Sequence, residues 1–191
     1  GGAVAMVRHL AALGHRRIAH ISGEARNYDA RERLRGYRDA MKRFAGGAEP
    51  SLTIEGDFTD AAGYRAATRL LETSPAATAI FAANDSMAIG CLSALAEAGR
   101  RVPEDVAVAG FDDIPTASFT IPPLTSVRVS IADLGALALE RLLNGVAMEN
   151  RQKKRQETLP ATLVVRKSCG AAGPRKLELE SKMASISHIG G

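Results

Sequence analysis

Polar and aromatic side chains follow four short apolar runs of this sequence, at places where a folded chain can present them together. In chain order, these residues are Asn27, Asp29, Phe58, Asn84 and Asp112. Carboxylates and amides can hydrogen-bond a molecule rich in hydroxyl groups or ring nitrogens, while an aromatic ring stacks on its flat face. The residue types therefore predict a binding site for a small polar molecule.

Arg33 adds a cation to this set. It falls about one turn into a predicted helix and shares a flank with Ala30 and Tyr37, three and four residues away. A guanidinium group can hold two neighbouring oxygens in one plane, which a lysine cannot do. The alternative is a surface arginine in an arginine-rich helix. Phe58 has a similar alternative, as a core aromatic residue.

The other candidates also have structural alternatives. Asp29 can cap the helix that follows it. Asn84 and Asp85 both precede a helix, where one cap suffices and the other residue is left without a structural role. Asp112 and Asp113 can begin a turn, but two adjacent carboxylates at the end of a buried strand are costly unless they are hydrogen-bonded. We therefore interpret this last pair as functional.

The sequence shows none of the common catalytic motifs. It contains no nucleophile elbow, phosphate-binding loop, dinucleotide fingerprint or paired metal ligands. Its two cysteines lack metal-ligand spacing and indicate a reducing compartment. The histidines form no obvious site, and they are His9, His15, His20 and His188. We therefore expect no enzyme activity, no metal and no cofactor.

Apolar runs that suit buried strands alternate with patterns of helical period. Strands are expected at 17–22, 52–56, 78–82, 106–110, 125–129 and 158–165, and helices at 2–13, 29–44, 60–72, 85–98 and 132–144. This alternation predicts a doubly wound α/β fold, a parallel sheet with helices on both faces. Ligands of such sheets bind beyond the carboxyl ends of the strands. The candidate residues should therefore share one edge.

Composition narrows the class of protein further. The chain has 191 residues, 46% of them hydrophobic, which is enough for a substantial core. The net charge is +4, but the only dense basic cluster, at 151–155, is interpreted as a solvated loop rather than a nucleic-acid site. Neither a membrane-spanning run nor a secretory signal pattern is found, so we expect a cytoplasmic protein with no membrane partner.

Seven segments of the sequence resemble one known family in order and spacing. They are GHRRIA at 14–19, RERLRGY at 31–37, EGDF at 55–58, AIFAAND at 79–85, RVPEDV at 101–106, GFDD at 110–113 and PPLT at 122–125. Together they resemble the effector-binding core of bacterial LacI/GalR transcription regulators over residues 1–169. The resemblance implies a periplasmic-binding-protein-like fold, in which a ligand binds between two subdomains.

The resemblance also assigns roles to the candidate residues. It makes Arg33 and Asp112 the principal polar contacts of the effector and Phe58 a stacking wall. Asn84 and Asp29 become supporting hydrogen-bond partners, and Asn27 occupies another position that contacts effector in some members. Arg, Asp, Asn and Phe suit a pentose, a hexose, a nucleoside or a purine, and we favour a sugar.

The resemblance divides the chain into parts. It implies that residues 1–120 form the C-terminal subdomain, that 121–150 are a returning strand and helix of the N-terminal subdomain, and that 151–169 are a final strand of the C-terminal subdomain. The Gly- and Ala-rich tail at 170–191 is expected to be disordered. The headpiece, hinge and first strands of the family have no counterpart, so the chain looks N-terminally truncated. Without the rest of the N-terminal subdomain, the strand and helix at 121–150 should expose Leu134, Leu137 and Leu142.

In a complete regulator, the resemblance implies a homodimer in which ligand binding controls operator affinity allosterically, through a headpiece absent from this chain. The residues predicted for the dimer interface are Met87, Ile89, Cys91, Phe119 and Ile121. The alternative is a periplasmic sugar-binding protein of a transport system, which has a similar fold. A headpiece upstream supports regulation, whereas an apolar signal upstream supports transport.

Overall fold

A seven-stranded sheet forms the centre of the structure, a computed structural model that describes residues 1–47, 52–147, 161–171 and 175–178. In chain order the strands are β1 (Ile18–Ser22), β2 (Thr53–Glu55), β3 (Ala79–Ala82), β4 (Ala107–Asp112), β5 (Thr125–Val129), β6 (Ala161–Val165) and β7 (Arg175–Glu178). They lie in the spatial order β2-β1-β3-β4-β5-β6-β7. The first five strands of this order are parallel, and β6 and β7 run antiparallel to their neighbours.

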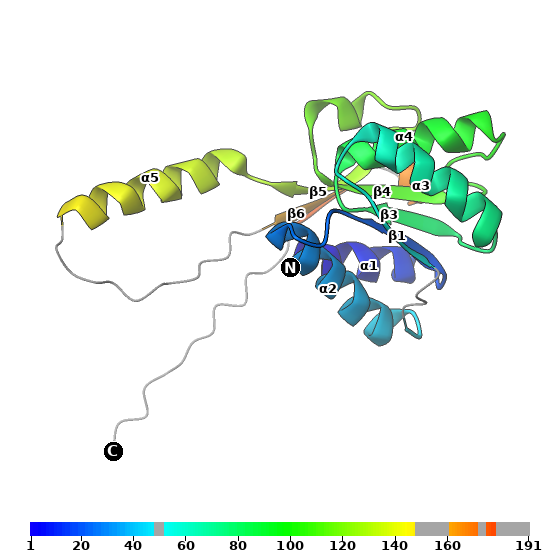
Figure 1. Ribbon diagram of the computed structural model, residues 1–191, viewed down its shortest axis with the longest axis horizontal. Coiled ribbons are helices and arrows are strands. Elements are labelled where there is room, and N and C mark those ends of the chain that lie inside the picture. The colour runs from blue at the N-terminus through cyan, green and yellow to red at the C-terminus, as the bar shows by residue number, and fades with distance from the viewer. Residues whose placement is uncertain (48–51, 148–160, 172–174, 179–191) are drawn as a thin grey trace, which may run out of the picture.

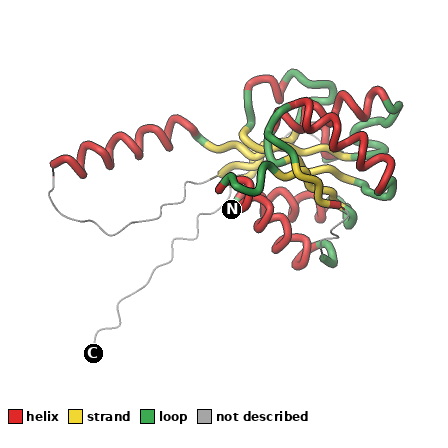
Figure 2. Tube along the Cα trace, viewed as in Figure 1, coloured by secondary structure: helices red, strands yellow, loops and turns green. Residues whose placement is uncertain are grey.

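Helices cover both faces of the sheet (Figures 1 and 2). α1 (Gly2–Ala12) and α2 (Tyr28–Phe44) cover one face, and α3 (Asp60–Thr73) and α4 (Asp85–Glu97) cover the other. A fifth helix, α5 (Ile131–Ala147), follows β5. Side chains of a strand alternate between faces, so Phe81 of β3 packs under α1 and α2, whereas Ile80 packs under α3 and α4. The predicted doubly wound α/β fold is confirmed, with element ends close to those expected.

Three helices begin at a residue whose side chain accepts a backbone N–H of the first turn. Asn27 caps α2, Thr59 caps α3 and Asn84 caps α4. Capping of this helix, the structural alternative for Asp29, is performed by Asn27 instead, whose side chain accepts the N–H of Ala30 over 3.1 Å. The helix therefore begins at Tyr28, and the Asp29 carboxylate is exposed.

His20 is a core residue of β1. Its ring stacks on Tyr37 with 4.7 Å between ring centroids, and its Nδ1 lies 2.8 Å from the Phe81 carbonyl oxygen. Complete burial lowers the pKa of His20 to about 4, so the ring is neutral at pH 7. A neutral ring with Nδ1 protonated can donate to that carbonyl, which gives this histidine a structural role.

The predicted division of the chain needs two corrections. Residues 121–150 do not form one piece of another subdomain, because β5 lies inside this sheet, parallel to β4, with Thr125, Ser126 and Val127 buried. The tail at 170–191 is not wholly disordered, since Arg175–Glu178 pairs with β6 as β7. The basic cluster at 151–155 and the rest of the tail, at 172–174 and 179–191, lie outside the described residues.

α5 extends away from the body of the sheet (Figure 1). Leu139, Leu142 and Leu143 on this helix are 58%, 67% and 63% exposed. Leu137 is half-buried, and the side chain of Leu134 lies outside the described ones. The expected apolar surface is therefore present at Leu142. In the part of the chain that the structure describes, no helix combines the length and apolar character needed to cross a membrane.

Candidate functional site

Arg33 and Asp112 meet at the carboxyl edge of the parallel strands. Arg33 lies in the second turn of α2, and Asp112 is the last residue of β4. The Arg33 Nη2 atom donates to Asp112 Oδ1 over 3.1 Å. The two side chains remain 17% and 31% exposed, so each is partly open to solvent. An arginine and a carboxylate side by side offer donors and acceptors to neighbouring hydroxyl groups of one ligand.

The guanidinium of Arg33 is held in place from two further directions. Its Cζ atom lies 4.0 Å from the centre of the Phe111 ring, which places the cation over the ring face. Its Nη1 atom donates to the carbonyl oxygen of Ala83, the residue after β3. The group is therefore oriented before any ligand binds, which lowers the entropy lost on binding.

Burial raises the pKa of Asp112 above that of an ordinary aspartate, while the charge and hydrogen bond of Arg33 oppose this rise. The charge of Asp29 adds a smaller contribution that raises the pKa of Asp112. Asp29 is therefore near enough to Asp112 to act on it electrostatically. Asn27, in contrast, uses its side-chain oxygen to cap α2, and the structure shows no contact that joins it to Arg33 or Asp112 among the described residues.

Phe58 and Asn84 form a second pair at the same edge. The Asn84 side chain donates from Nδ2 to the Phe58 carbonyl oxygen over 2.9 Å, while its oxygen accepts the N–H of Met87. The Phe58 ring lies so close over Gly23 that a Cβ on that glycine would be less than 3.0 Å from it. Phe58 has a φ of 69°, which is uncommon for a bulky residue. Asn84 is thus both a cap and the support of the aromatic residue.

Two arginines at this edge were missed in the sequence. Arg128 of β5 and Arg166 after β6 both form ion pairs with Asp113, whose side chain is only 1% exposed. The signal was present, because two adjacent carboxylates at a strand end require partners. Neither arginine, however, belongs to a pattern that distinguishes it from a surface residue.

A groove of about 590 Å³ lies between α2 and β2 and reaches the carboxyl end of β1 at Ser22 and Gly23. Its lining includes Arg31, Arg35 and Arg38, but neither Arg33 nor Asp112. Arg31 donates to two backbone carbonyls and Arg35 pairs with Glu32. We assign no ligand to this groove, because two of its cations already have partners in the chain.

Comparison with known proteins decides the family. Residues 7–169 match the family model of the periplasmic binding protein-like domain. The chain belongs to this family. The match includes both members of the Arg33–Asp112 pair, so the candidate site lies inside the family domain.

Similar proteins that carry this domain are regulators of transcription. The repressor PurR of Haemophilus influenzae is 38% identical over 170 residues, which are 88% of this chain and 50% of that protein. The structure of transcriptional regulator CelR with cellobiose has a TM-score of 0.83 and 39% identity, covering 88% of this chain and 51% of that one. The Lac repressor dimer bound to operator and the anti-inducer ONPF has a TM-score of 0.80 and 36% identity, covering 87% and 57%.

The chain spans about half the length of the curated relatives it matches. The LacI/GalR resemblance is confirmed by these relatives, which are repressors and regulators by name. They favour regulation over the transport alternative, and none of the three is an enzyme. In the described residues of this periplasmic binding protein-like domain, no cluster of three His, Cys, Asp or Glu side chains could hold a metal ion.

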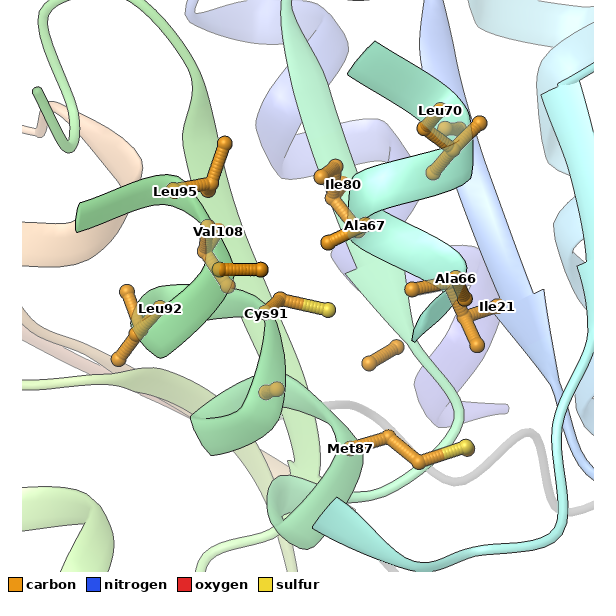
Figure 3. Close-up of a cluster of buried hydrophobic side chains, with 14 of the residues drawn as sticks. Ile21, Ala66, Ala67, Leu70, Ile80, Met87, Cys91, Leu92, Leu95 and Val108 are labelled. Atoms are coloured by element: carbon orange, nitrogen blue, oxygen red, sulfur yellow. The ribbon is translucent and has the colours of Figure 1, made fainter. Parts of the chain in front are cut away.

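Part of the predicted dimer interface was wrong. Met87 and Cys91 are fully buried and belong to the core between α3, α4 and the sheet (Figure 3). Side chains on the buried face of α4 cannot contact a partner chain without unpacking the domain. Ile89 is half-buried, and Phe119 and Ile121 are 81% and 94% exposed. These three residues stay candidates for an interface.

Asp85 has a structural role that sequence reasoning had left open. It is completely buried, accepts the N–H of Ile114 over 2.8 Å and the hydroxyl of Ser126 over 2.6 Å. Its Oδ1 atom leaves no space for a Cβ on Gly110. Burial raises the pKa of Asp85 to about 6, although both hydrogen bonds oppose the rise. The carboxylate therefore ties the start of α4 to β5.

We predict that Asp85→Asn makes the domain less sensitive to pH. An ordinary aspartate loses its proton near pH 3.8 and folded Asp85 near pH 6, so between these values the folded state binds more protons. The unfolding free energy of the unaltered protein therefore falls as the pH rises through this window, by about 2–3 kcal/mol from this group. Urea unfolding at pH 4.5, 5.5 and 7 measures this difference. The unfolding free energy of the variant, relative to that of the unaltered protein, should rise as the pH rises.

Asp57→Asn is the control for this prediction. Hydrogen bonds from Thr59 hold the pKa of Asp57 below its ordinary value of 3.8. The stability that Asp57 contributes therefore changes only below about pH 4, and its substitution should leave the pH dependence between pH 4.5 and 7 unaltered. A parallel pH dependence for Asp85→Asn and the unaltered protein would contradict the assigned burial of a titrating carboxylate.

Proposed function

We propose that this chain is the effector-binding core of a bacterial LacI/GalR-type transcription regulator. The observation that carries the proposal is the Arg33–Asp112 pair, 3.1 Å apart and partly exposed at the edge where ligands of parallel sheets bind. Phe58, supported by Asn84, supplies an aromatic surface at the same edge. Asp29 adds a carboxylate near Asp112. Asn27 caps α2 through its Oδ1 atom and stays a candidate contact of the effector.

The ligand that fits best is a sugar. Arg33 presents coplanar donors and Asp112 presents acceptors, which suits the neighbouring hydroxyl groups of a pyranose or furanose ring. An aromatic ring can pack on the apolar face of such a ring. The similar regulator CelR is complexed with cellobiose, which supports the same class of ligand.

The partners follow from the same relatives. We propose a homodimer that binds operator DNA through a headpiece outside these residues, because a Lac repressor dimer bound to operator is among the similar structures. A protein that binds operator DNA in a bacterium would act in the cytoplasm. The exposed leucines of α5 would pack against the other subdomain of the regulator. Ligand binding would control operator affinity if the two arrangements of the subdomains differ in their affinity for ligand.

Thermal unfolding of the full-length gene product with a panel of pentoses, hexoses, disaccharides, nucleosides and purines tests this proposal. A ligand at a hundredfold excess over its dissociation constant should stabilise the folded state by about 2.7 kcal/mol. A raised melting temperature with a sugar, but not with its epimers, is the expected result. A folded protein that no compound in the panel stabilises would contradict the proposed site.

We predict that Ile121→Glu weakens the homodimer. Ile121 is 94% exposed and adjoins Phe119, so the two present a large apolar surface. A buried glutamate at the centre of an interface should cost about 2 kcal/mol or more, which is about a thirtyfold rise in the dimer dissociation constant. Sedimentation velocity over a concentration series measures it. Leu13→Glu is the control, since Leu13 is an exposed apolar residue directly after α1. Equal effects of both changes would contradict the interface.

A further inference from the structure

Asp113 lies against two arginines that come from different strands. Arg128 is in β5 and donates from Nε to Asp113 Oδ2 over 2.6 Å. Arg166 follows β6, and its Nη1 atom lies 2.6 Å from Asp113 Oδ1 and donates to the Leu124 carbonyl oxygen over 2.7 Å. Because the Asp113 side chain is excluded from solvent, its charge is balanced by these cations rather than by water. One carboxylate therefore joins the end of β4 to β5 and to the residue after β6.

The strands joined by Asp113 are those before and after α5. β5 leads directly into α5, which extends away from the sheet (Figure 1), and β6 is the next described strand. Asp113 also contacts β5 through its backbone, because its N–H donates to Ser126 Oγ over 3.1 Å. Asp113 therefore contacts β5, which precedes α5, and Arg166, which follows β6.

Asp113 also directly follows Asp112, the carboxylate that faces the proposed ligand site. Asp112 pairs with Arg33 and lies opposite Arg128 in the register of β4 and β5. Asp112 and Asp113 have φ angles of 102° and 55°, a region that residues with a Cβ adopt only where surrounding contacts hold them. Arg33 holds this turn on the ligand side, and Arg128 and Arg166 hold it on the side of the strands. The turn is therefore contacted by both regions at once.

We propose that the Asp112–Asp113 turn transmits ligand binding to α5, with Arg128 as the positioning residue that carries it to β5. A ligand whose hydroxyl groups bind between Arg33 and Asp112 replaces their direct contact. The turn then moves to the position that the ligand favours, and the Asp113–Arg128 pair moves the end of β5 with it. This inference rests on the proposed function, because it requires a ligand at Arg33 and a response in DNA binding.

The experiment uses the full-length gene product and the sugar that stabilises it most. Sugar affinity is measured by calorimetry, and operator affinity by fluorescence anisotropy with and without the sugar. Arg128→Gln removes the charge at a side chain that is 44% exposed, so the variant should fold. We expect it to reduce the sugar-induced change in operator affinity by about fivefold or more, with the sugar dissociation constant altered less than about threefold. Arg128→Lys, which keeps the charge, should recover part of the response.

Arg101→Gln is the matched control, because it breaks another exposed arginine–aspartate pair, Arg101–Asp105, away from the turn. It should leave the response to sugar unchanged. A full response in Arg128→Gln would overturn the inference while leaving the proposed function intact, whatever the melting temperature of the variant. Operator affinity that no sugar changes in the unaltered protein would instead overturn the proposed function, and this inference with it.

Discussion

Arg33→Ala is expected to abolish the stabilisation of the full-length protein by its ligand. The substitution removes the coplanar donors, the cation over Phe111 and the partner of Asp112 in one step. Loss of one member of a partly buried charged pair costs about 2–5 kcal/mol of binding, and a loss of 2.7 kcal/mol raises the dissociation constant about a hundredfold. A ligand concentration that stabilises the unaltered protein by about 2.7 kcal/mol would then give almost no shift in melting temperature.

Two further variants make this prediction specific. Asp112→Ala should lose the ligand-induced shift as well, because it removes the acceptors and leaves Arg33 without its ion pair. Arg35→Ala should keep the shift, since this arginine of the same helix is 69% exposed and pairs with the neighbouring Glu32. Because each variant can change the stability of the free protein, the quantity compared is the shift between ligand-free and ligand-bound samples. A full shift in Arg33→Ala would contradict the site.

The main elements of the fold could be predicted because their signals are local. Ala79–Ala82 is apolar throughout and buried throughout as β3, and Asn84 directly after it caps α4. α4 ends just before Gly99, which has a φ of 66°. Each of these signals depends on side chains a few residues apart, so one sequence suffices to read them.

The site could be predicted only in part, because its contacts join residues far apart in the chain. The expected position of both residues at the carboxyl edge of the sheet was enough to place Arg33 near Asp112, and the structure shows that they form an ion pair. Nothing local distinguishes Arg128 and Arg166 as partners of Asp113. Asn84 shows a further difficulty, since its amide caps a helix and supports Phe58 together. At Asn84, the role as a helix cap and the role at the candidate site therefore do not exclude each other.

The interface residues show where a resemblance is insufficient. It assigned Met87, Ile89 and Cys91 on one helix to a dimer contact, although residues two apart on a helix do not share a face. The structure turns Met87 and Cys91 toward Gly63 and the core. The helical period alone therefore places Ile89 on a different face of the helix from Met87 and Cys91. The strand β7 had no comparable signal, because its four residues RKLE alternate too briefly to define a strand.

Gly90→Ala is expected to destabilise the domain strongly, although alanine favours a helix by about 1 kcal/mol over glycine. A Cβ at Gly90 of α4 would lie less than 3.0 Å from the Asp60 carbonyl oxygen and from the Tyr64 nitrogen of α3. Gly63 approaches the Met87 backbone in the same way from the other helix. All of these atoms belong to the backbone, so no change of rotamer relieves the clash and the two helices must separate. Separation of α3 from α4 opens the core that Leu70, Met87 and Leu95 fill.

The net effect of Gly90→Ala is the difference between these contributions. Overpacking of a core typically costs about 1–3 kcal/mol and occasionally more, and a rigid shift of two helices belongs at the upper end of that range. We therefore expect the unfolding free energy to fall by about 2–3 kcal/mol, measured as a lower urea midpoint. Gly135→Ala is the control, because the space around Gly135 of α5 is open and only the helix preference applies there. Equal stability of Gly90→Ala and the unaltered protein would mean that α3 and α4 are not in backbone contact, and the buried position of Met87 would then lose its physical reason.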